Sequence, residues 1–245
     1  MKIRILTFFP DIFKSYFENV APFKKAIGSG EIEIEILQIR DFTKDRHRRC
    51  DGYPYGGGAG LVLFCQPIMD AINSTENPGR ILFMSPDGKK FDQNYAKELS
   101  GENVITLVAG RYEGYDNRIF SMIANEKVSV GDYVLTGGEC PALIIIDALV
   151  RLIPDVLENE KSLEEESFSS GLLEYAQYTR PENYNGFEVP EVYLSGHHGK
   201  IREHRFENAL INTYETRPDL LKNRALNESE LKIIKNHIKE NCHGS

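Results

Sequence analysis

The stretch VGDYVLTGGE, residues 130–139, decides how the rest of the chain can fold. It places Gly131, Gly137 and Gly138 around the apolar run 133–135. Glycine has no Cβ, so it tolerates positive φ and lets a ligand approach the backbone amides. The apolar run predicts a short buried strand between two bends. A side chain at Gly137 or Gly138 is expected to invade the space of a bound small molecule or to strain the bend. A tight turn between a core strand and a core helix fits the same spacing.

On both sides of this stretch, expected strands and helices alternate along the chain. The apolar run 140–154 predicts a buried helix with Pro141 in its first turn. Upstream we expect strands over residues 3–8, 32–37, 80–84 and 104–109, and helices opening at Pro10 and over 66–73, 92–99 and 116–124. This alternation predicts an α/β fold with a mostly parallel sheet that is covered on both faces.

Three expected strands end in loops that carry glycine or proline, over residues 85–88, 110–114 and 136–138. Ligands of parallel sheets bind beyond the carboxyl ends of the strands, so these loops are expected to form one pocket. Nucleotide-binding patterns do not account for it, because Leu61 stands where G-x-G-x-x-G needs glycine and no Gly-Lys-Ser/Thr sequence is present. A G-x-S-x-G elbow is absent too, which excludes the α/β-hydrolase interpretation.

Composition restricts the partners and the compartment. The net charge of −8 gives no overall basic footprint for nucleic acid, so any RNA contact must come from local patches. The four cysteines form no CxxC pair and no metal-ligand spacing, and His198 and His204 are badly spaced for a shared metal. Free thiols, no cleavable signal sequence and no run of membrane-spanning length predict a soluble cytoplasmic protein without a membrane partner.

Two segments carry candidate contacts to phosphate. Residues 40–60 are polar, then basic, then glycine-rich, and predict a long surface loop. In it the cluster Arg46, Arg48 and Arg49 suits phosphate groups, or is simply a solvated run of charge. Nearer the carboxyl end, Lys200, Arg202 and Arg205 cluster around one helix start.

The composition changes after Pro154. Residues 155–166 hold six acids against one lysine and predict an exposed linker. From Ser167 on we expect a helical pattern, with one helix over 198–214. A second helix begins at the cap formed by Asn227 and Glu230, and one face of it carries the apolar residues Leu231, Ile234 and Ile238.

With these motifs assembled, the chain resembles the bacterial tRNA (guanine-N1)-methyltransferases. The resemblance runs nearly end to end and rests on ten strings in order: FPDIF (9–13), RDFTKDRHR (40–48), DGYPYGGGAG (51–60), SPDG (85–88), GRYEG (110–114), VGDYVLTGGE (130–139), RLIP (151–154), ESFSSGLLEYAQYTRPE (166–182), LSGHHGKIREHR (194–205) and TRPDLL (216–221).

The resemblance implies a trefoil-knotted α/β domain of the SPOUT class over residues 1–160, which binds S-adenosylmethionine. It further implies a flexible acidic linker over 161–170 and a small helical tRNA-binding domain over 171–245. Topology rules treat knots as rare exceptions, so no periodicity could have predicted one. The family acts as a homodimer with active sites at the subunit interface. It methylates N1 of the guanine immediately 3′ of the anticodon, and the resemblance also implies a magnesium requirement.

Position by position, the resemblance implies a cofactor pocket made by the three loops above. The residues are Met84, Ser85, Pro86, Gly110, Tyr112, Glu113, Gly114, Val130, Gly131, Asp132, Tyr133, Val134, Leu135, Gly137 and Gly138. The resemblance implies that Arg151 is the catalytic arginine. The family's general base is the aspartate of an E-D-S-F string, which here reads Glu165-Glu166-Ser167-Phe168, so the base position is Glu166, one methylene longer.

The reaction explains these residue types. Guanine N1 carries a proton, which a carboxylate within about 3 Å can remove as the methyl group transfers. Negative charge then builds toward O6, where a guanidinium stabilises it. Outside the family context, Arg151 also fits a charge at a helix C-terminus and Glu166 one of several solvated acids. A non-catalytic tRNA-binding protein, inactivated by the change from Asp to Glu, is the alternative function.

Overall fold

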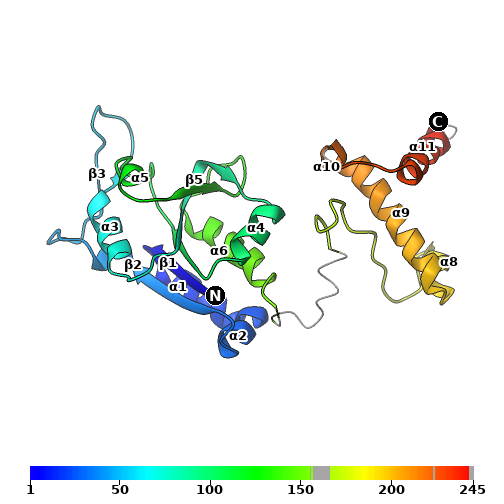
Figure 1. Cartoon of the computed structure of the whole chain (residues 1–245), viewed down its shortest axis with the longest axis horizontal. Coiled ribbons are helices and arrows are strands. Elements are labelled where there is room, and N and C mark those ends of the chain that lie inside the picture. Colours follow the sequence, from blue (N-terminus) through cyan, green and yellow to red (C-terminus); the bar gives the residue numbers. More distant parts are fainter. Residues whose placement is uncertain (155, 157–165, 223, 243–245) are drawn as a thin grey trace. The chain divides into compact units, whose positions relative to one another are not determined.

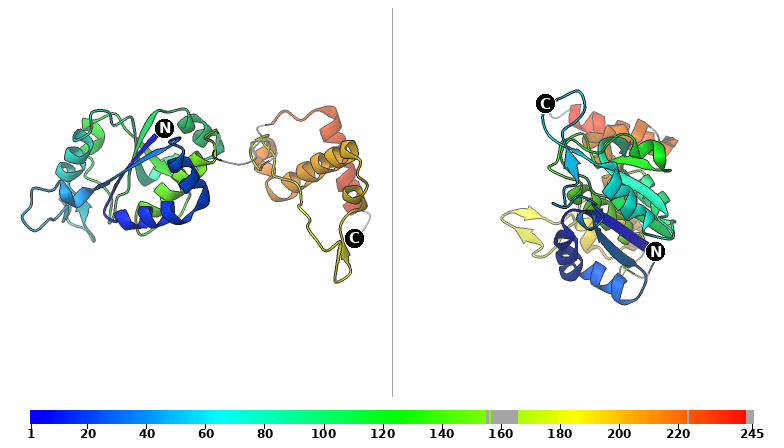
Figure 2. Two further views of the ribbon diagram at one scale, coloured as in Figure 1. Left: turned by 90° about the horizontal axis from the view of Figure 1, so that it is seen from below. Right: turned by 90° about the vertical axis from the view of Figure 1, so that its left-hand side faces the viewer.

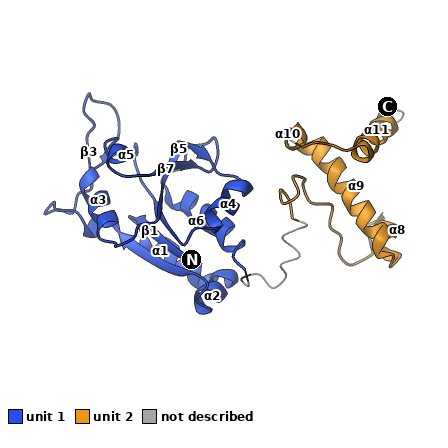
Figure 3. Cartoon of the chain, in the orientation of Figure 1, with its two compact units in different colours: residues 1–158 blue, residues 159–245 orange. Residues whose placement is uncertain are grey.

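The computed structural model describes residues 1–154, 156, 166–222 and 224–242 of the 245-residue chain. The chain divides into two compact units, residues 1–158 and 159–245 (Figure 3), and each is described by itself. Most of the expected acidic linker, residues 155 and 157–165, lies outside the described residues. Within the described part of the chain, no helix is both long and apolar enough to cross a membrane.

The first unit is built on a five-stranded parallel sheet in the order β2-β1-β6-β5-β7 (Figure 1). This agrees with the expected parallel α/β fold. The strands are β1 (Lys2–Thr7), β2 (Glu33–Gln38), β5 (Arg80–Lys90), β6 (Val104–Val108) and β7 (Glu126–Ser129). A separate antiparallel pair is formed by β3 (Asp51–Gly52), which lies within the long loop expected over residues 40–60, and β4 (Val62–Leu63), which follows that loop.

Helices cover both faces of the sheet (Figures 1 and 2). One apolar cluster joins β1, β5 and β6 to α1 (Pro10–Asn19), α2 (Ala21–Gly28), α4 (Gln93–Ser100) and α6 (Glu139–Val150). A second cluster joins the opposite face to α3 (Cys65–Asn73) and α5 (Ile119–Met122), next to the short 3₁₀ helix η1 (Ile39–Asp41). The alternation of strand side chains explains the division, because Leu82 faces the first cluster while Ile81 and Phe83 face the second.

Three expectations for the first unit are wrong. Residues 133–135 are not a buried strand but an exposed bend, in which Val134 is 89% exposed. The flanking glycines turn the chain away from the sheet, and β7 before them supplies the edge strand. The expected strand end at Met84 is a bulge instead, since Met84 and Lys89 both pair with Val128 and β5 continues to Lys90. The helix expected over 116–124 is confined to α5.

The second unit contains α8 (Glu191–Leu194), α9 (His198–Thr216), α10 (Pro218–Lys222) and α11 (Glu228–Cys242). The helical pattern expected from Ser167 on is wrong for residues 167–190. Pro181, Pro190 and Gly186 interrupt that segment, and it forms only the short hairpin of β8 (Asn183–Tyr184) and β9 (Phe187–Glu188), which projects from the helices (Figure 2).

A small apolar core holds the second unit together. Leu172, Ala209, Leu210 and Ile234 are buried in it. The cap predicted at α11 is confirmed: the Glu230 amide donates to Asn227 Oδ1 at 2.9 Å, and the Asn227 amide donates to Glu230 Oε2 at 2.9 Å. The expected apolar face is only partly buried, because Leu231 and Ile238, on the same helix as Ile234, are exposed.

One ion pair fastens the edge strand β7 to the sheet. The Arg80 guanidinium at the start of β5 donates to Glu126 at 2.9 Å and lies 2.7 Å from Glu98. Tyr95 donates its hydroxyl to the same Glu126 carboxylate at 2.5 Å. The hydrogen bond from Arg80 lowers the pKa of Glu126, because it stabilises the charged form.

We therefore predict that Arg80→Met lowers the free energy of unfolding by about 1–2 kcal/mol at pH 7, allowing for the partial exposure of the pair. The pKa of Glu126 is below its usual 4.5 in the folded chain. The contribution of Glu126 to the free energy of unfolding is therefore complete above the pKa that Glu126 has in the unfolded chain. It disappears as the pH falls through the pKa that Glu126 has in the folded chain. Urea unfolding at pH 7 and pH 3 should show the difference from wild type shrinking in acid. Lys90→Met, which removes an exposed 3.5 Å contact to Asp132, is the control. An equal loss at both pH values contradicts the prediction.

Candidate functional site

A cavity of about 480 Å³ lies at the carboxyl-terminal edge of the parallel sheet. Its walls come from the β5 bulge at 84–87, the loop after β6 at 110–115 and the segment 127–138 that leads from β7 to α6. The three loops expected to converge do so. Its size is within the range of about 300–1,000 Å³ that is common for small-molecule sites.

All but one of the residues expected to bind the cofactor line this cavity. They are Met84, Ser85, Pro86, Gly110, Tyr112, Glu113, Gly114, Val130, Gly131, Tyr133, Val134, Leu135, Gly137 and Gly138. Asp132 is not among the lining residues; its carboxylate is 90% exposed and lies 3.5 Å from Lys90 Nζ. Tyr133 and Leu135 are 54% and 43% exposed although they line the cavity, so a ligand there would cover apolar surface.

The β5 bulge forms one wall and is anchored at its far end by β7. A Cβ built at Gly88 would lie 2.3 Å from the Val128 amide nitrogen, so only glycine lets the two backbones come this close. Lys127 Nζ lies 2.7 Å from Asp87 Oδ2 and lowers the pKa of that carboxyl. The Ser85 hydroxyl donates to Asp87 Oδ1 at 2.5 Å. The bulge is therefore fixed by its own polar contacts.

Tyr115 lies under the loops and joins the ends of two strands. Its hydroxyl is 2.7 Å from the Val108 carbonyl oxygen of β6 and 3.3 Å from the Met84 carbonyl oxygen of β5. Burial raises the pKa of this phenol, so it stays protonated and can donate. A Cβ at Gly110 would lie 2.4 Å from the Tyr115 ring, which explains the glycine there.

The glycine pair before α6, Gly137 and Gly138, lies close to the backbone of the loop after β6. The Gly138 amide donates to the Gly110 carbonyl oxygen at 2.8 Å. A Cβ built at Gly138 would lie 2.7 Å from Ala109 Cα and 2.8 Å from the Gly110 nitrogen. Of the two alternatives given for such a side chain, invasion of the ligand's space or strain of the bend, the structure favours the second, because the side chain would first displace the neighbouring loop.

A buried acid at the start of α6 pairs with the loop after β6. Glu139 is 2% exposed, and its Oε2 lies 3.1 Å from Arg111 Nε. The Thr7 hydroxyl at the end of β1 donates to Glu139 Oε1 at 3.1 Å. The Arg111 guanidinium carbon lies 4.4 Å from the centre of the Phe9 ring, a cation–π contact. Gly137 leaves room for the pair, since a Cβ there would lie 2.5 Å from Arg111 Nε.

The structure places the two expected catalytic residues in different units. Arg151 is the C-cap of α6, and its amide donates to the Asp147 carbonyl oxygen at 3.3 Å. Glu166 begins the described part of the second unit, where its carbonyl oxygen accepts from the Ser169 amide at 3.2 Å.

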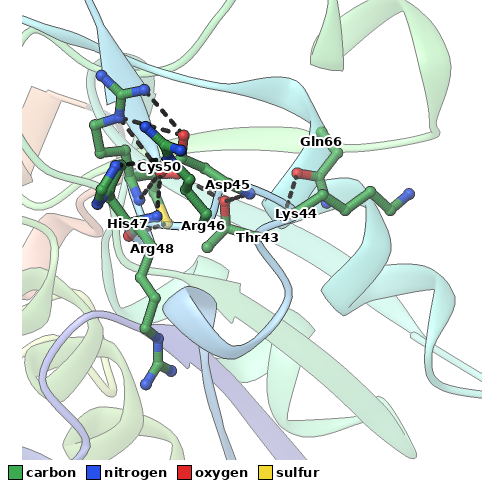
Figure 4. Close-up of polar contacts among 9 residues, drawn as sticks. Thr43, Lys44, Asp45, Arg46, His47, Arg48, Cys50 and Gln66 are labelled. Carbon is green, nitrogen blue, oxygen red and sulfur yellow. Dashed lines mark hydrogen bonds and ion pairs between the residues drawn. The ribbon is translucent and has the colours of Figure 1, made fainter.

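The basic loop, residues 41–49, contains acidic side chains that pair with its arginines (Figure 4). Arg49 Nη2 lies 2.9 Å from Asp45 Oδ2, and Arg48 pairs with Asp41. Arg46 Nε donates to the His47 ring nitrogen Nε2 at 2.8 Å. The Asp45 carboxylate also accepts from the His47 amide at 2.8 Å, so it organises the turn as well as the charge. All three expected arginines are exposed.

The second expected basic cluster lies at the amino-terminal half of α9. Lys200 and Arg202 are exposed there. Arg205 turns toward residues 175–194, and its guanidinium carbon lies 4.6 Å from the centre of the Tyr175 ring.

The described residues contain no group of three or more His, Cys, Asp or Glu side chains that could hold a metal ion. Cys50, Cys65 and Cys140 are free thiols. The magnesium requirement implied by the resemblance therefore finds no support in the described part of the chain.

Sequence reasoning missed Arg111, Tyr115 and Glu139. Arg111 and Glu139 lie inside the strings GRYEG and VGDYVLTGGE, but no spacing shows that they pair. The sequence did contain one signal for the pair: Glu139 directly precedes the apolar helix expected over 140–154, and an acid that becomes buried there needs a partner.

The fold and the cavity define the first unit as a parallel α/β domain with a cavity of small-molecule size at the carboxyl ends of its strands. Residues 1–223 match the family described as tRNA (Guanine-1)-methyltransferase TrmD. The tRNA (guanine-N(1)-)-methyltransferase of Dictyoglomus turgidum is 47% identical over 241 residues, which cover 98% of each chain. That of Clostridium botulinum strain Kyoto is 47% identical over 242 residues, 98% of this chain and 100% of the relative. That of Clostridium beijerinckii is 48% identical over 238 residues, 96% of this chain and 98% of the relative.

The chain thus belongs to the tRNA (guanine-1)-methyltransferase family, an enzyme family, and the resemblance seen in the sequence is confirmed.

We predict that Glu139→Gln lowers the free energy of unfolding by about 1–3 kcal/mol, because Arg111 then loses its buried counter-charge. The loops at 110–114 and 136–138 should loosen together. We expect the affinity for S-adenosylmethionine to fall about tenfold in isothermal titration at a temperature where the variant remains folded. Glu76→Gln, an exposed acid outside the cavity, is the matched control. Lost stability with unchanged affinity would show that the pair does not shape the cavity.

Proposed function

We propose that this chain transfers the methyl group of S-adenosylmethionine to N1 of the guanine immediately 3′ of the anticodon in tRNA. The observation that carries the proposal is the convergence of fourteen of the fifteen expected cofactor residues on one cavity. Family membership over nearly the full length supports the same activity.

The residues of the cavity fit such a cofactor. Three glycine-bearing loops bring backbone amides to its walls, which suits the polar edges of a nucleoside and an amino acid. Residues 133–135 offer exposed apolar surface for an adenosine ring. When bound, S-adenosylmethionine supplies a methyl group activated by its sulfonium. The chain's own part is to orient the two reactants and to exclude water.

Glu166 is the proposed general base and Arg151 the proposed partner of guanine O6. The Glu166 carboxylate removes the N1 proton while the methyl group transfers, which makes N1 a competent nucleophile. The Arg151 guanidinium stabilises the charge that develops on O6. The target base must leave its stack to reach these groups.

We also propose a two-fold dimer in which each active site takes Arg151 from one subunit and Glu166 from the other. In this arrangement residues 1–160 form a knotted SPOUT-type domain, 161–170 a linker and 171–245 a tRNA-binding domain. Family membership supports this arrangement. Contacts to tRNA phosphates are proposed for Arg46, Arg48, Arg49, Lys200, Arg202 and Arg205.

Glu166→Gln tests the general base, because glutamine keeps the size but cannot accept the proton. We expect single-turnover methylation of a tRNA transcript to fall about 10²–10⁴-fold, with the affinity for S-adenosylmethionine near that of wild type. Glu207→Gln makes the same chemical change at an exposed position of α9 and should leave the rate unchanged. A rate for Glu166→Gln within about threefold of wild type removes this residue from the role.

Mixed dimers test the composite site. Arg151→Ala and Glu166→Gln homodimers should each be inactive. When differently tagged chains are co-expressed, the mixed dimer holds one site with both residues intact and one with neither. Purified mixed dimers should therefore regain up to half of the wild-type activity. If they stay inactive while tagged wild-type dimers are active, each site takes both residues from one chain.

A further inference from the structure

A second cavity, of about 460 Å³, lies entirely within the second unit. Its walls are formed by the segment 176–182, by Val189, by the last two residues of α8, and by Arg205 of α9. It does not belong to the proposed methyl-donor site, whose lining residues are all in the first unit. Among its lining residues, only Arg205 has been given a proposed role above.

Aromatic rings dominate one wall. The Tyr178 and Tyr193 rings are 5.4 Å apart at an angle of 46°, and His204 packs edge-on against Tyr193 with its ring centre also 5.4 Å away. Tyr178 is 49% exposed, so its ring is held by Tyr193 yet is open to a further contact. Such a ring is a platform on which a flat partner can stack.

Tyr193, which lines the same cavity, carries a hydroxyl donor that is not used within the described chain. Its oxygen is buried and has no hydrogen-bond partner among the described residues. A buried polar group left unpaired costs about 1–3 kcal/mol, so this hydroxyl favours a ligand that can accept its proton. Burial raises the pKa of this phenol, and the donor therefore remains protonated at neutral pH.

Cationic groups border the rings. Arg180 and Arg205 line the cavity, and Arg205 is held by the face of Tyr175. Lys200 and Arg202 are exposed on the same helix as Arg205. The exposed ring, the hydroxyl donor and the bordering cations together suit a flat heteroaromatic group that has hydrogen-bond acceptors and is attached to a chain of anions. That is the description of an unstacked base in single-stranded RNA.

We propose that this cavity binds one unstacked nucleobase of the RNA substrate, with the base stacked on Tyr178 and accepting a hydrogen bond from Tyr193. The inference rests on the proposed tRNA substrate and adds a base contact to the phosphate contacts already proposed. The cavity then contributes affinity for a looped or unpaired segment of RNA rather than for a duplex.

The experiment measures binding of a 5′-labelled tRNA transcript to the full-length protein by fluorescence anisotropy. Tyr178→Ala should raise the Kd about 5- to 150-fold, the range expected for loss of one base–aromatic stack. Tyr178→Phe keeps the ring and should stay within about twofold of wild type. Tyr193→Phe removes only the hydroxyl and should raise the Kd about two- to tenfold. Tyr184→Ala, an exposed tyrosine that does not line the cavity, is the control.

Salt dependence separates stacking from charge. Tyr178→Ala should leave the slope of log Kd against log salt unchanged, whereas Arg202→Ala, a proposed phosphate contact, should lower it by about one. A reduced slope for Tyr178→Ala, an unchanged Kd, or an equal loss for Tyr184→Ala overturns the proposal. Circular dichroism melts must show that the variants are folded at the assay temperature. If Tyr178→Ala is not folded, Tyr178→Leu, which keeps an apolar side chain of moderate size but removes the ring, takes its place and should raise the Kd in the same way.

Two further outcomes keep the hypotheses apart. If Tyr178→Ala weakens self-association in sedimentation velocity, and the Kd returns to the wild-type value at dimer-saturating concentration, a partner chain occupies the cavity and the base proposal fails. Wild-type methylation of the same transcript is measured in parallel. If the wild-type protein methylates the transcript but Tyr178→Ala leaves the Kd unchanged, only the cavity proposal fails. If the wild-type protein does not methylate the transcript although Tyr178→Ala raises the Kd, only the proposed activity fails.

Discussion

The candidate site in the first unit depends on one ion pair, between the half-buried Arg111 and the buried Glu139. The sheet brings the ends of its strands to one edge, but the loops beyond them are irregular and exposed. The pair joins the loop after β6 to the first turn of α6, and Thr7 adds the end of β1. The ion pair acts together with the backbone hydrogen bond from the Gly138 amide to the Gly110 carbonyl oxygen, and both hold the two loops against each other.

Around this pair the glycines set how closely the loops can approach one another. At Gly88, Gly110 and Gly138 an added Cβ would meet the backbone or ring of a neighbouring segment, at 2.3, 2.4 and 2.7 Å. The cavity wall is therefore a packing of backbone against backbone, fixed before a ligand arrives. A site organised in this way needs little ordering on binding. This fits a proposed reaction in which orientation supplies much of the rate enhancement.

Periodicity predicted the sheet because β1, β2, β5 and β6 are apolar or alternating runs, and helices were also predicted at the positions of α3, α4 and α9. It failed at residues 133–135, where three apolar side chains face a cavity instead of the core, because the same apolar run suits either surface. The cofactor residues were predicted from the resemblance to a family. The convergence of the loops was predicted from the parallel sheet, whose strands end at one edge. The pairing of Arg111 with Glu139 could not be foreseen, since it depends on three-dimensional contact between distant segments.

The acids of the basic loop have a consequence for how it would meet a polyanion. Asp41 and Asp45 already neutralise Arg48 and Arg49, so these carboxylates act as built-in counterions in a chain of net charge −8. A phosphate that contacted Arg48 or Arg49 would have to displace a tethered carboxylate. Such a contact would neutralise less net charge than a contact to an arginine without a carboxylate partner, so fewer of the cations condensed on the nucleic acid would be released and the salt dependence of binding would be weaker.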